Sequence, residues 1–305
     1  MRHFVNIKDI ATNELKKIVS DAKKRKEKRK KLKTLEADKD IPLKGHLLIQ
    51  MFEKTSLRTR LSFFLAIKQL GGEAITLRPD ELHFGTESIE DTAKILSAYG
   101  DAFMLRTDND QKINEFRKYL TIPIINGLSP SSHPTQVLSD VFTIEEIKKK
   151  PISNLDICWI GDANNVLNSL IEAAVKFSFR LKIGCPKKYE PNRKILGWAK
   201  KNNAKIEIIN DAKKAAKNVD VIFTDKVISM NDRLNKNKKI KNFKKFKVDS
   251  KVMECAKKNA IFLHCLPRSF EVSDDVFLSK RSKVWQQASN RTHVQKSILL
   301  WCLKK

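Results

Sequence analysis

The sequence predicts an α/β protein with two doubly wound parallel-sheet domains joined by a long bridging helix. Short apolar runs alternate with amphipathic stretches along the 305-residue chain. Strands separated by helices in this way form parallel sheets with helices on both faces. The alternation starts again after Pro151, which marks a second domain. We expect the first domain over residues 1–140 and the second over residues 141–289, with helix Thr135–Lys149 as the bridge.

The first domain is expected to begin with a helix over Asn13–Lys33. The second half of this helix, AKKRKEKRKKLK, is so highly charged that we expect a solvated face that frays into a loop. The pair Gly71-Gly72 is expected to end a later helix, because glycine favours that position. The other elements are, in chain order, strand Leu47–Phe52, helix Ser56–Leu70, strand Ala74–Leu77, helix Ser88–Tyr99, strand Ala102–Arg106, helix Ile113–Leu120, strand Pro123–Asn126 and helix Thr135–Lys149.

The second domain is expected to repeat the pattern and to end in a long helix. Its elements are strand Ile157–Ile160, helix Val166–Phe177, strand Leu181–Gly184, helix Asn192–Lys201, strand Ile206–Ile209, helix Ala212–Ala216, strand Val221–Thr224, strand Ile261–Cys265 and helix Thr292–Leu303.

Composition excludes several classes of protein. With 41% hydrophobic residues the chain can bury a sizeable core. No apolar run approaches the ~20 residues that a membrane helix needs, and the first ten residues lack the apolar region of a signal peptide. The cysteines are irregularly spaced and form no CxxC pair, so we expect reduced thiols in the cytoplasm and no zinc site. These cysteines are Cys158, Cys185, Cys255, Cys265 and Cys302.

The formal net charge of +26 allows two interpretations, a nucleic-acid or anionic partner, or solvated basic faces throughout. Lysines occur in almost every segment, with clusters at residues 23–33, 148–150 and 236–247. Aromatic residues do not alternate with them as in a platform that stacks bases. The distribution favours solvated faces over nucleic-acid binding.

Polar residues follow the predicted strands, and ligands of open parallel sheets bind beyond the carboxyl ends of the strands. A chain built only for packing has little reason to place charge and hydrogen-bonding groups there. The residues at these ends are Glu53, Lys54, Arg106, Thr107, Asn126, Gly161, Asp162, Asp225, His264 and Cys265.

The segment KTSLRTRLSFF places arginines at a helix start, where the helix dipole favours anions over cations. Ser56 is a favoured N-cap, and the backbone N–H groups after it point beyond the helix end. Arg58 and Thr59 add a guanidinium and a hydroxyl, so a bound phosphate accounts for the arrangement. Two solvated arginines in a charged helix are the alternative for this segment taken alone.

Two further elements favour the phosphate site. Arg106 ends a strand of the same predicted sheet, and HPTQ, His133 to Gln136, begins the bridging helix. His133 and Gln136 both offer donors to an oxygen atom. Together with Ser56 and Arg58 they predict a polar site that binds oxygens.

Five ordered segments, FEKTSLRTR, HPTQ, IGDANN, TDKVISM and HCLPR, resemble the signature segments of the ornithine carbamoyltransferases, in the aspartate/ornithine carbamoyltransferase family. The ending NRTHVQKSILLWCL is similar to the last helix of that family, and the resemblance covers essentially the whole chain. It implies that the last helix, about residues 290–305, returns to the first domain. It also implies a trimer and the absence of metals and organic cofactors.

The resemblance implies transfer of the carbamoyl group from carbamoyl phosphate to L-ornithine, which yields L-citrulline and phosphate in arginine biosynthesis. The first domain would bind carbamoyl phosphate and the second would bind ornithine. The implied carbamoyl-phosphate residues are Ser56, Leu57, Arg58, Thr59, Arg106, His133, Gln136, Cys265, Leu266 and Arg291. The implied ornithine residues are Asn165, Asp225, Ser229 and Met230.

The chemistry of the reaction agrees with these roles. Attack by the amine puts negative charge on the carbamoyl oxygen, where Arg106 and His133 would stabilise it. Guanidinium groups would stabilise the charge that grows on the leaving phosphate. The amine must be neutral to attack, and Asp225 and Cys265 are the pair expected to position and deprotonate it, with Cys265 the acceptor that the family suggests.

Several positions depart from the family pattern and keep the amine substrate open. Leu57 stands where threonine is usual, as in carbamoyltransferases that act on N-acyl-ornithines. Lys226-Val227 replaces Thr-Trp, Asn231 replaces glycine and Ser289 replaces glutamate. The alternatives are a carbamoyltransferase for an N-acyl-ornithine, putrescine or aspartate, or a catalytically lapsed basic protein that binds nucleic acid. An aspartate enzyme would normally lack the cysteine of HCLPR.

Overall fold

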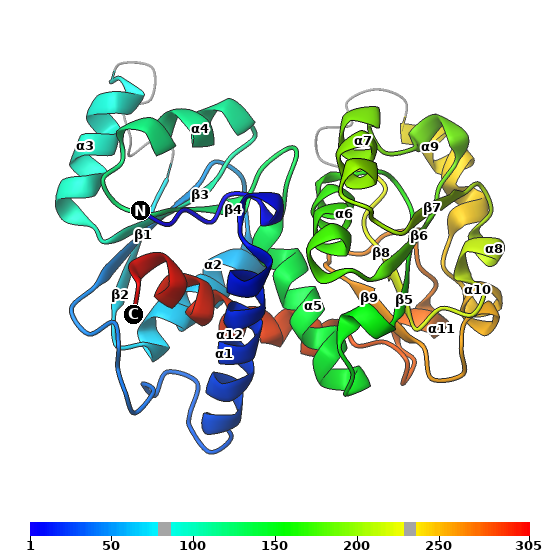
Figure 1. Ribbon diagram of the computed structural model, residues 1–305, viewed down its shortest axis with the longest axis horizontal. Helices are drawn as coiled ribbons and strands as arrows, with labels where there is room; N and C mark the ends of the chain where they lie inside the picture. Colours follow the sequence, from blue (N-terminus) through cyan, green and yellow to red (C-terminus); the bar gives the residue numbers. More distant parts are fainter. Residues whose placement is uncertain (79–86, 229–235) are drawn as a thin grey trace. The chain divides into compact units, whose positions relative to one another are not determined.

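The computed structural model, which describes residues 1–78, 87–228 and 236–305, is an α/β protein with two parallel sheets (Figure 1). Residues 1–142 and 289–305 form one compact unit, and residues 143–288 form another. The first unit holds a four-stranded sheet and the second a five-stranded sheet. The strand pairs of the described ranges are all parallel. The predicted fold class is confirmed.

The first sheet has the strand order β2-β1-β3-β4, so the first strand along the chain lies inside the sheet. Its register places Phe52 opposite Arg106, and the Glu53 N–H donates to the Arg106 carbonyl at 2.9 Å. The polar residues that follow β1 and β3 therefore share one edge. The strands are β1 (Leu47–Phe52), β2 (Glu73–Leu77), β3 (Ala102–Arg106) and β4 (Ile124–Leu128).

Helices cover both faces of the first sheet (Figure 1). On one face α3 (Ile89–Tyr99) and α4 (Asp110–Tyr119) enclose a buried apolar cluster that includes Met51 and Phe116. The other face carries α1 (Thr12–Lys28), α2 (Leu57–Gln69) and part of α12 (Val284–Leu303). The strands β1, β3 and β4 are mostly buried, which is why their sequences are largely apolar without alternation, whereas the edge strand β2 is partly exposed.

The second sheet has the order β7-β6-β5-β8-β9, with the chain running outward from β5 in both directions. Strand order reverses between β5 and β8, the kind of position where ligands bind in open α/β sheets. The strands are β5 (Asp156–Ile160), β6 (Arg180–Gly184), β7 (Ile206–Ile209), β8 (Val221–Thr224) and β9 (Ile261–His264).

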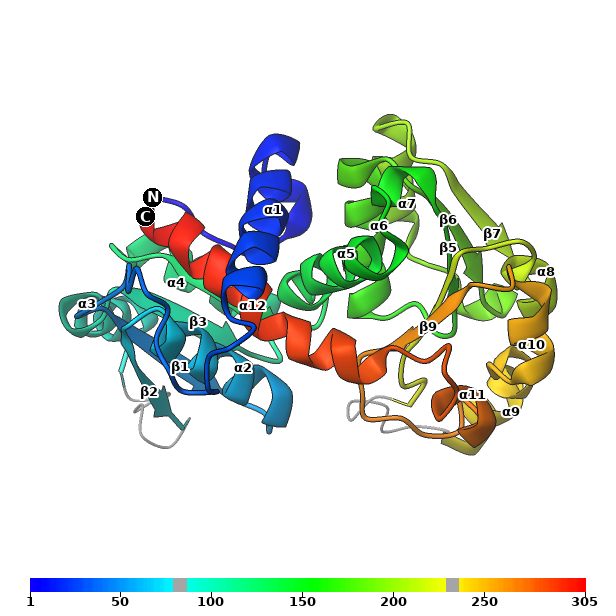
Figure 2. The ribbon, with the colours of Figure 1, turned by 90° about the horizontal axis from the view of Figure 1, so that it is seen from below.

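Two groups of helices flank the second sheet (Figures 1 and 2). One group is a neighbouring pair, α6 and α7, and the other group contributes to a buried cluster with Cys158, Ile222 and Phe262. The first group is α6 (Asn165–Phe177) and α7 (Arg193–Lys201). The second is α8 (Ala212–Ala216), α9 (Lys236–Phe243), α10 (Ser250–Cys255) and α11 (Asp274–Phe277).

Most predicted elements are present within a few residues of their expected ends. The bridging helix is α5 (Pro134–Lys148), and Gly71 follows α2 with φ 90°, as expected for a helix end. Three helices, α9, α10 and α11, were not predicted, because they are short or dominated by lysine. The last helix begins at Val284, eight residues before the predicted start at Thr292.

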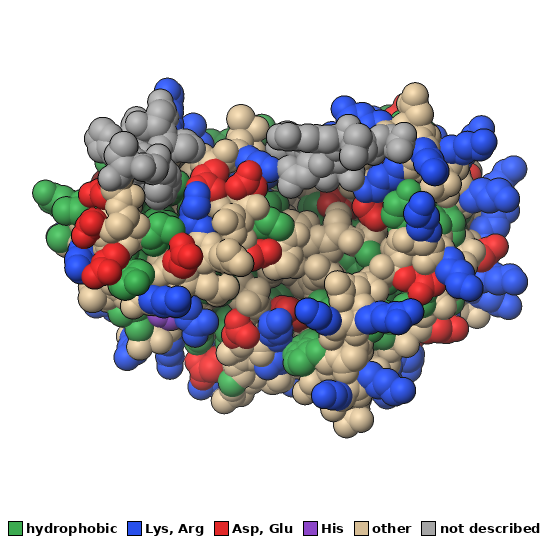
Figure 3. Space-filling view, turned by 90° about the horizontal axis from the view of Figure 1, so that it is seen from above, with side chains coloured by type: hydrophobic (Ala, Val, Ile, Leu, Met, Phe, Trp, Pro, Cys, Tyr) green, Lys and Arg blue, Asp and Glu red, His purple; other side chains and the backbone are tan. Residues whose placement is uncertain are grey.

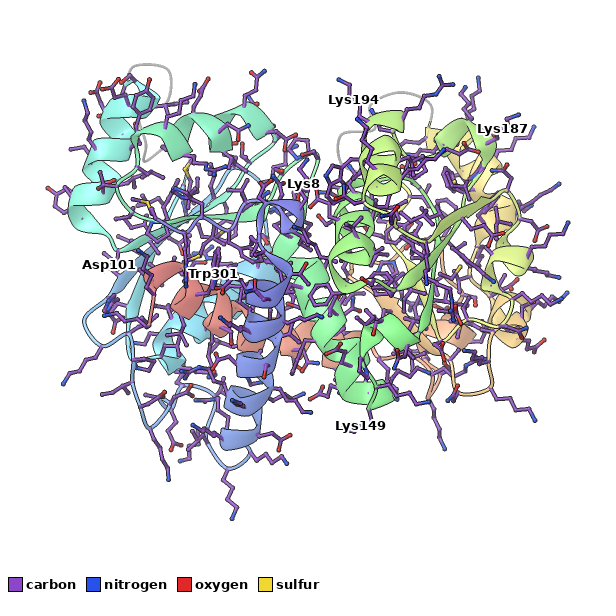
Figure 4. All side chains as sticks on the ribbon, in the orientation of Figure 1. Lys8, Asp101, Lys149, Lys187, Lys194 and Trp301 are labelled. Carbon is purple, nitrogen blue, oxygen red and sulfur yellow. The ribbon has the colours of Figure 1, made fainter. Side chains whose placement is uncertain are left out.

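The last helix packs on α1 within the first unit (Figure 2). Ser297 donates its hydroxyl to Asp21 at 2.6 Å. Trp301, labelled in Figure 4, donates its indole N–H to Glu14 at 2.7 Å. These contacts confirm the expected return of the C-terminal helix to helices of the first domain.

A buried ion-pair cluster fixes the same helix to the loop after α1. The Lys296 ammonium is fully buried and lies 2.9 and 2.7 Å from the two carboxylate oxygens of Asp38. Arg29 donates to the same carboxylate at 2.7 Å, and Lys296 also donates to Gln69 at 3.3 Å. The expectation that the second half of the first helix is solvated is wrong for Arg29, which is only 8% exposed. Lys28 beside it is exposed, as expected.

The charges of this cluster have pKa values set by burial and by one another. Burial alone would raise the pKa of Asp38, but the hydrogen bonds from Lys296 and Arg29 hold it below its usual value. Burial lowers the pKa of Lys296 to about 8, because the bonds to Asp38 only partly offset the desolvation of the ammonium. The cluster is therefore sensitive to the loss of either partner.

Replacing Lys296 by methionine is expected to destabilise the protein by about 3 kcal/mol, because it leaves the buried Asp38 carboxylate without its closest ammonium. Urea unfolding followed by circular dichroism measures the change. Lys94→Met, which removes an exposed ion pair with Glu90 on α3, is the control and is expected to change stability little. Equal unfolding midpoints for the two variants would contradict the role of the cluster.

Candidate active site

The start of α2 is tied to the end of β3 by a serine that does not cap the helix. Ser56 occupies the N-cap position, as predicted, but its side chain makes no capping bond. Its hydroxyl instead accepts a hydrogen bond from Nη1 of Arg106 at 2.9 Å. The first N–H groups of a helix have no partners within the helix, so this end suits an anion. The predicted meeting of Ser56 with Arg106 is present.

A buried arginine from the C-terminal helix joins two other segments of the first unit. Arg291 donates from Nη1 to the Gln136 amide oxygen at 2.9 Å and from Nη2 to the Thr59 hydroxyl at 2.6 Å. Gln136 in turn donates to Asp140 at 2.9 Å. Arg291, Gln136 and Thr59 are each at most 2% exposed. The helices α2, α5 and α12 therefore meet around one guanidinium.

His133, the residue before α5, is a neutral imidazole in this surrounding. It is 4% exposed, and burial lowers its pKa well below the usual value. The positive charges of Arg291, Arg106 and Arg58 lower the pKa further. A neutral ring can donate one hydrogen bond to an oxygen without adding a fourth positive charge. Arg58 and Arg106, which the sequence predicts to lie near His133, and Arg291, which the resemblance implies, thus all act on this ring.

The end of β1 supports Arg106 through contacts that the sequence did not indicate. The Glu53 carboxylate accepts hydrogen bonds from the Thr107 hydroxyl and from the Lys112 ammonium. Since Glu53 also bonds the Arg106 carbonyl through its backbone, the two strand ends are held in register. The only available clue was the position of Glu53 and Thr107 at predicted strand ends.

Leu57, the departure from the family pattern, is the first residue of α2 and is 68% exposed. Its side chain therefore contributes little to the core of the unit. Leucine in place of threonine therefore removes a hydroxyl from the surface at the start of α2 and exposes an apolar side chain there. The backbone N–H of residue 57 is unaffected.

The second unit brings a carboxylate and a thiol together at the ends of β8 and β9. The Cys265 thiol donates to Oδ1 of Asp225 at 3.0 Å. Both residues are partly exposed, so a small molecule can reach them. The pairing of Asp225 with Cys265 agrees with the sequence-based expectation.

Asn164, which the sequence analysis missed, completes this arrangement. Its amide nitrogen donates to Oδ2 of Asp225 at 2.7 Å, and its amide oxygen caps α6. Asn165, the predicted ornithine residue, is the first residue of α6 and is partly buried. An asparagine before a helix is so common a cap that only the fold shows its second contact.

His264 faces away from Cys265 and forms a structural contact, as the alternation of a strand requires. Its Nε2 lies 3.1 Å from Glu271, and its Nδ1 accepts the Leu266 N–H at 2.8 Å. Burial would raise the pKa of Glu271, but hydrogen bonds from His264 and from the Ser269 N–H lower it overall. Leu266 has φ 60°, which turns the chain directly after the thiol.

Two predicted ornithine residues, Ser229 and Met230, lie outside the described residues. Over residues 1–78, 87–228 and 236–305, no group of three or more His, Cys, Asp or Glu side chains is arranged to hold a metal ion. Within the same ranges, no helix is long and apolar enough to span a bilayer.

Two family models match the chain in order along its length. Residues 2–146 match the aspartate/ornithine carbamoyltransferase carbamoyl-P binding domain, and residues 153–302 match the Asp/Orn binding domain of the same family. The chain belongs to the aspartate/ornithine carbamoyltransferase family. The second model extends to residue 302, although residues 289–305 pack with the first compact unit.

Individual members of this carbamoyltransferase family are similar over their full lengths. An ornithine carbamoyltransferase of Brucella abortus is 41% identical over 307 residues, covering 100% of this chain and 96% of the relative. A solved ornithine carbamoyltransferase of Pyrococcus furiosus superimposes with a TM-score of 0.91 at 38% identity, covering 98% and 96% of the two chains. An anabolic ornithine carbamoyltransferase of Campylobacter jejuni gives 0.89 at 37% identity, covering 99% of each.

His133 is expected to remain neutral at pH values where an ordinary imidazole, with a pKa of about 6.5, is already protonated. Because its folded-state pKa is lowered, the unfolded chain takes up a proton that the folded chain refuses, so stability falls as the pH drops below the ordinary value. Carbon-13 NMR of the imidazole rings, with His133→Gln to assign the resonance, measures the titration. A midpoint near the ordinary pKa would contradict the burial argument.

Proposed function

We propose that the protein is an ornithine carbamoyltransferase that converts carbamoyl phosphate and L-ornithine to L-citrulline and phosphate. The single observation that carries this is the cluster in which Arg106 bonds Ser56 and Arg291 bonds Thr59 and Gln136, around a neutral His133. Relatives at 38–41% identity over essentially the full chain bear that enzyme name. We assign carbamoyl-phosphate binding to the first domain and ornithine binding to the second.

In the proposed reaction the start of α2 holds the phosphate group. The N–H groups after Ser56, the Arg58 and Arg106 guanidinium groups and the Thr59 hydroxyl supply donors for its oxygens. The charge on these oxygens grows as the C–O bond to phosphate breaks, so the same donors bind the transition state more tightly than the ground state.

The carbamoyl group is assigned to His133 and Gln136, with Cys265, Leu266 and Arg291 completing the set. Attack by the amine converts the carbamoyl carbonyl into an oxyanion, which Arg106 and a neutral His133 stabilise by hydrogen bonds. A neutral imidazole keeps its donor available across the pH range in which the amine is titrated to its reactive form.

Asp225, Asn165, Ser229 and Met230 are assigned to ornithine. The Asp225 carboxylate attracts the ammonium form of the side chain, and the amine must then lose a proton before it attacks. The Cys265 thiol donates a hydrogen bond to the Asp225 carboxylate, so we assign the two residues together to positioning the amine and accepting its proton. We propose Cys265, Arg106 and His133 as the catalytic residues.

The amine substrate is the least constrained part of the proposal. Val227, which stands where tryptophan is usual, is 2% exposed and belongs to the apolar core of the second unit. Its smaller side chain and the exposed Leu57 are the changes that favour an N-acyl-ornithine or putrescine as the alternative substrate. Asp225 argues against aspartate, because it would repel the second carboxylate of that substrate.

The surface gives little support to a nucleic-acid function. Figure 3 shows a face on which Lys and Arg side chains are interspersed with Asp and Glu side chains. Lys187 and Lys194 extend away from the ribbon into solvent (Figure 4). Such interspersed charge on this face agrees with solvated basic side chains as the source of the net charge of +26.

We also propose a homo-oligomer, with a trimer as the family expectation. An apolar stripe on α2 supports a second copy of the chain as its cover. Leu57, Leu61 and Phe64 are 68%, 51% and 37% exposed and recur at helical spacing, and Ile75 on the edge strand β2 is 47% exposed. Light scattering measures the number of copies. A role in arginine biosynthesis in the cytoplasm remains part of the same proposal.

One assay tests the function directly. The purified protein is incubated with carbamoyl phosphate and, separately, ornithine, N-acetyl-ornithine, putrescine, lysine and aspartate, and phosphate release is measured with the carbamoylated product. We expect ornithine to give the highest kcat/KM, because relatives that match the chain over nearly its full length bear the name ornithine carbamoyltransferase. A higher value for another amine would move the assignment to that substrate, and no turnover with any amine would reject it.

Arg58→Ala is expected to lower kcat/KM for carbamoyl phosphate by about 10³-fold, because it removes a charged donor from the leaving phosphate. Thermal unfolding should change little, since Arg58 lies at the helix start. Arg117→Ala, which removes an exposed arginine of α4 in the same unit, is the matched control. Unchanged turnover of Arg58→Ala would remove this residue from the phosphate site.

A further inference from the structure

Asn164 makes two kinds of contact that use both ends of its amide group. The amide oxygen accepts the N–H groups of Val166 and Leu167 at 3.0 and 3.1 Å. The amide nitrogen donates to Oδ2 of Asp225 at 2.7 Å. Because the oxygen is committed to the two backbone donors, the nitrogen has to face the carboxylate, and the amide cannot be reversed without losing three hydrogen bonds.

We propose that Asn164 is a positioning residue that sets the orientation of Asp225 and, through it, of the Cys265 thiol. This inference rests on the proposed function, in which Asp225 binds the amine of ornithine. The backbone at the start of α6 fixes the orientation of the Asn164 amide. The hydrogen bond from this amide then fixes the rotation of the Asp225 carboxylate after β8.

Both oxygens of Asp225 are engaged on defined sides. Oδ2 accepts from Asn164 and Oδ1 accepts from the Cys265 thiol at 3.0 Å. A carboxylate has about four lone-pair directions, so about two remain for an ammonium or amine. Without the Asn164 bond the Asp225 carboxylate can rotate about its last side-chain torsion. Its oxygens then no longer point toward both the Cys265 thiol and the substrate amine.

A simple helix cap is the competing explanation, and the chain offers a comparison for it. Asn109 and Asn192 cap α4 and α7 through the same amide oxygen, accepting from Gln111 and Lys194 respectively. Their caps stabilise a helix start, whereas the cap at Asn164 is combined with a bond to the carboxylate of the proposed amine site. A substitution that keeps the cap but changes the donor therefore separates the two roles.

Asn164→Asp is such a substitution, because aspartate is of equal size and is an equally good cap. It replaces the N–H donor by a second carboxylate beside Asp225, and two carboxylates that share a site raise the pKa of one of them. We expect kcat/KM for ornithine at neutral pH to fall by about 10- to 100-fold, with the acid limb of its pH profile moved by about 1 to 2 units to higher pH.

Asn164→Ser provides a second variant, since serine keeps a capping hydroxyl but does not reach Asp225. We expect the same kind of loss in kcat/KM for ornithine without the displacement of the pH profile. In both variants the KM for carbamoyl phosphate should be unchanged. Partial recovery of activity at high pH for Asn164→Asp alone identifies the second carboxylate as the cause.

Asn192→Asp is the matched control, because it makes the same change at the cap of α7, which the site does not use. Asp225→Asn gives the result expected when the carboxylate itself is lost. A wild-type protein that makes no citrulline rejects the proposed function. An active wild type whose Asn164→Asp variant keeps the normal pH profile and KM for ornithine overturns the positioning role alone. Equal loss for both substrates with a lowered melting temperature also overturns it, in favour of a cap.

Discussion

The buried Arg291 guanidinium is the interaction on which the first-unit site depends. It connects the start of α2 to α5 through Thr59 and Gln136, two uncharged side chains that accept hydrogen bonds from it without cancelling its charge. Burial of a cation in this way is costly unless the surroundings are arranged for it. The charge that remains acts on His133, together with Arg106 and Arg58, and the resulting positive field suits a small anion.

Arg291 is held in place by the packing of α12 against the rest of the first unit. Five residues further along, Lys296 binds Asp38 and Gln69, and Gln69 is the last residue of α2. The helix α12 therefore contacts both ends of α2. Arg291 bonds Thr59 near the start of α2, and Lys296 bonds Gln69 at its end. The same helix therefore carries both the buried ion-pair cluster and Arg291.

The sequence was sufficient for the fold class, which follows from local patterns, and it named residues that the structure places in contact, such as Ser56 with Arg106 and Asp225 with Cys265. Apolar runs mark buried parallel strands, and the polar residues after them, such as Arg106 and Asp225, mark the ligand edge. Contacts between segments that lie far apart in the chain could not be predicted from the sequence. Asp38 and Lys296 look like ordinary charged residues, and they are buried because they meet although they lie 258 positions apart in the chain. Ser56 was expected to cap α2, yet the nearby Arg106 competes for its hydroxyl.

The two candidate sites differ in charge, and under the proposed function each suits one of two unlike substrates. The first unit surrounds a neutral imidazole with arginines and so favours a phosphorylated anion. The second offers a carboxylate whose two oxygens are already oriented by Asn164 and Cys265, which favours a cationic amine over an acidic one. Under the proposed function, the charge of Asp225 therefore favours ornithine over aspartate.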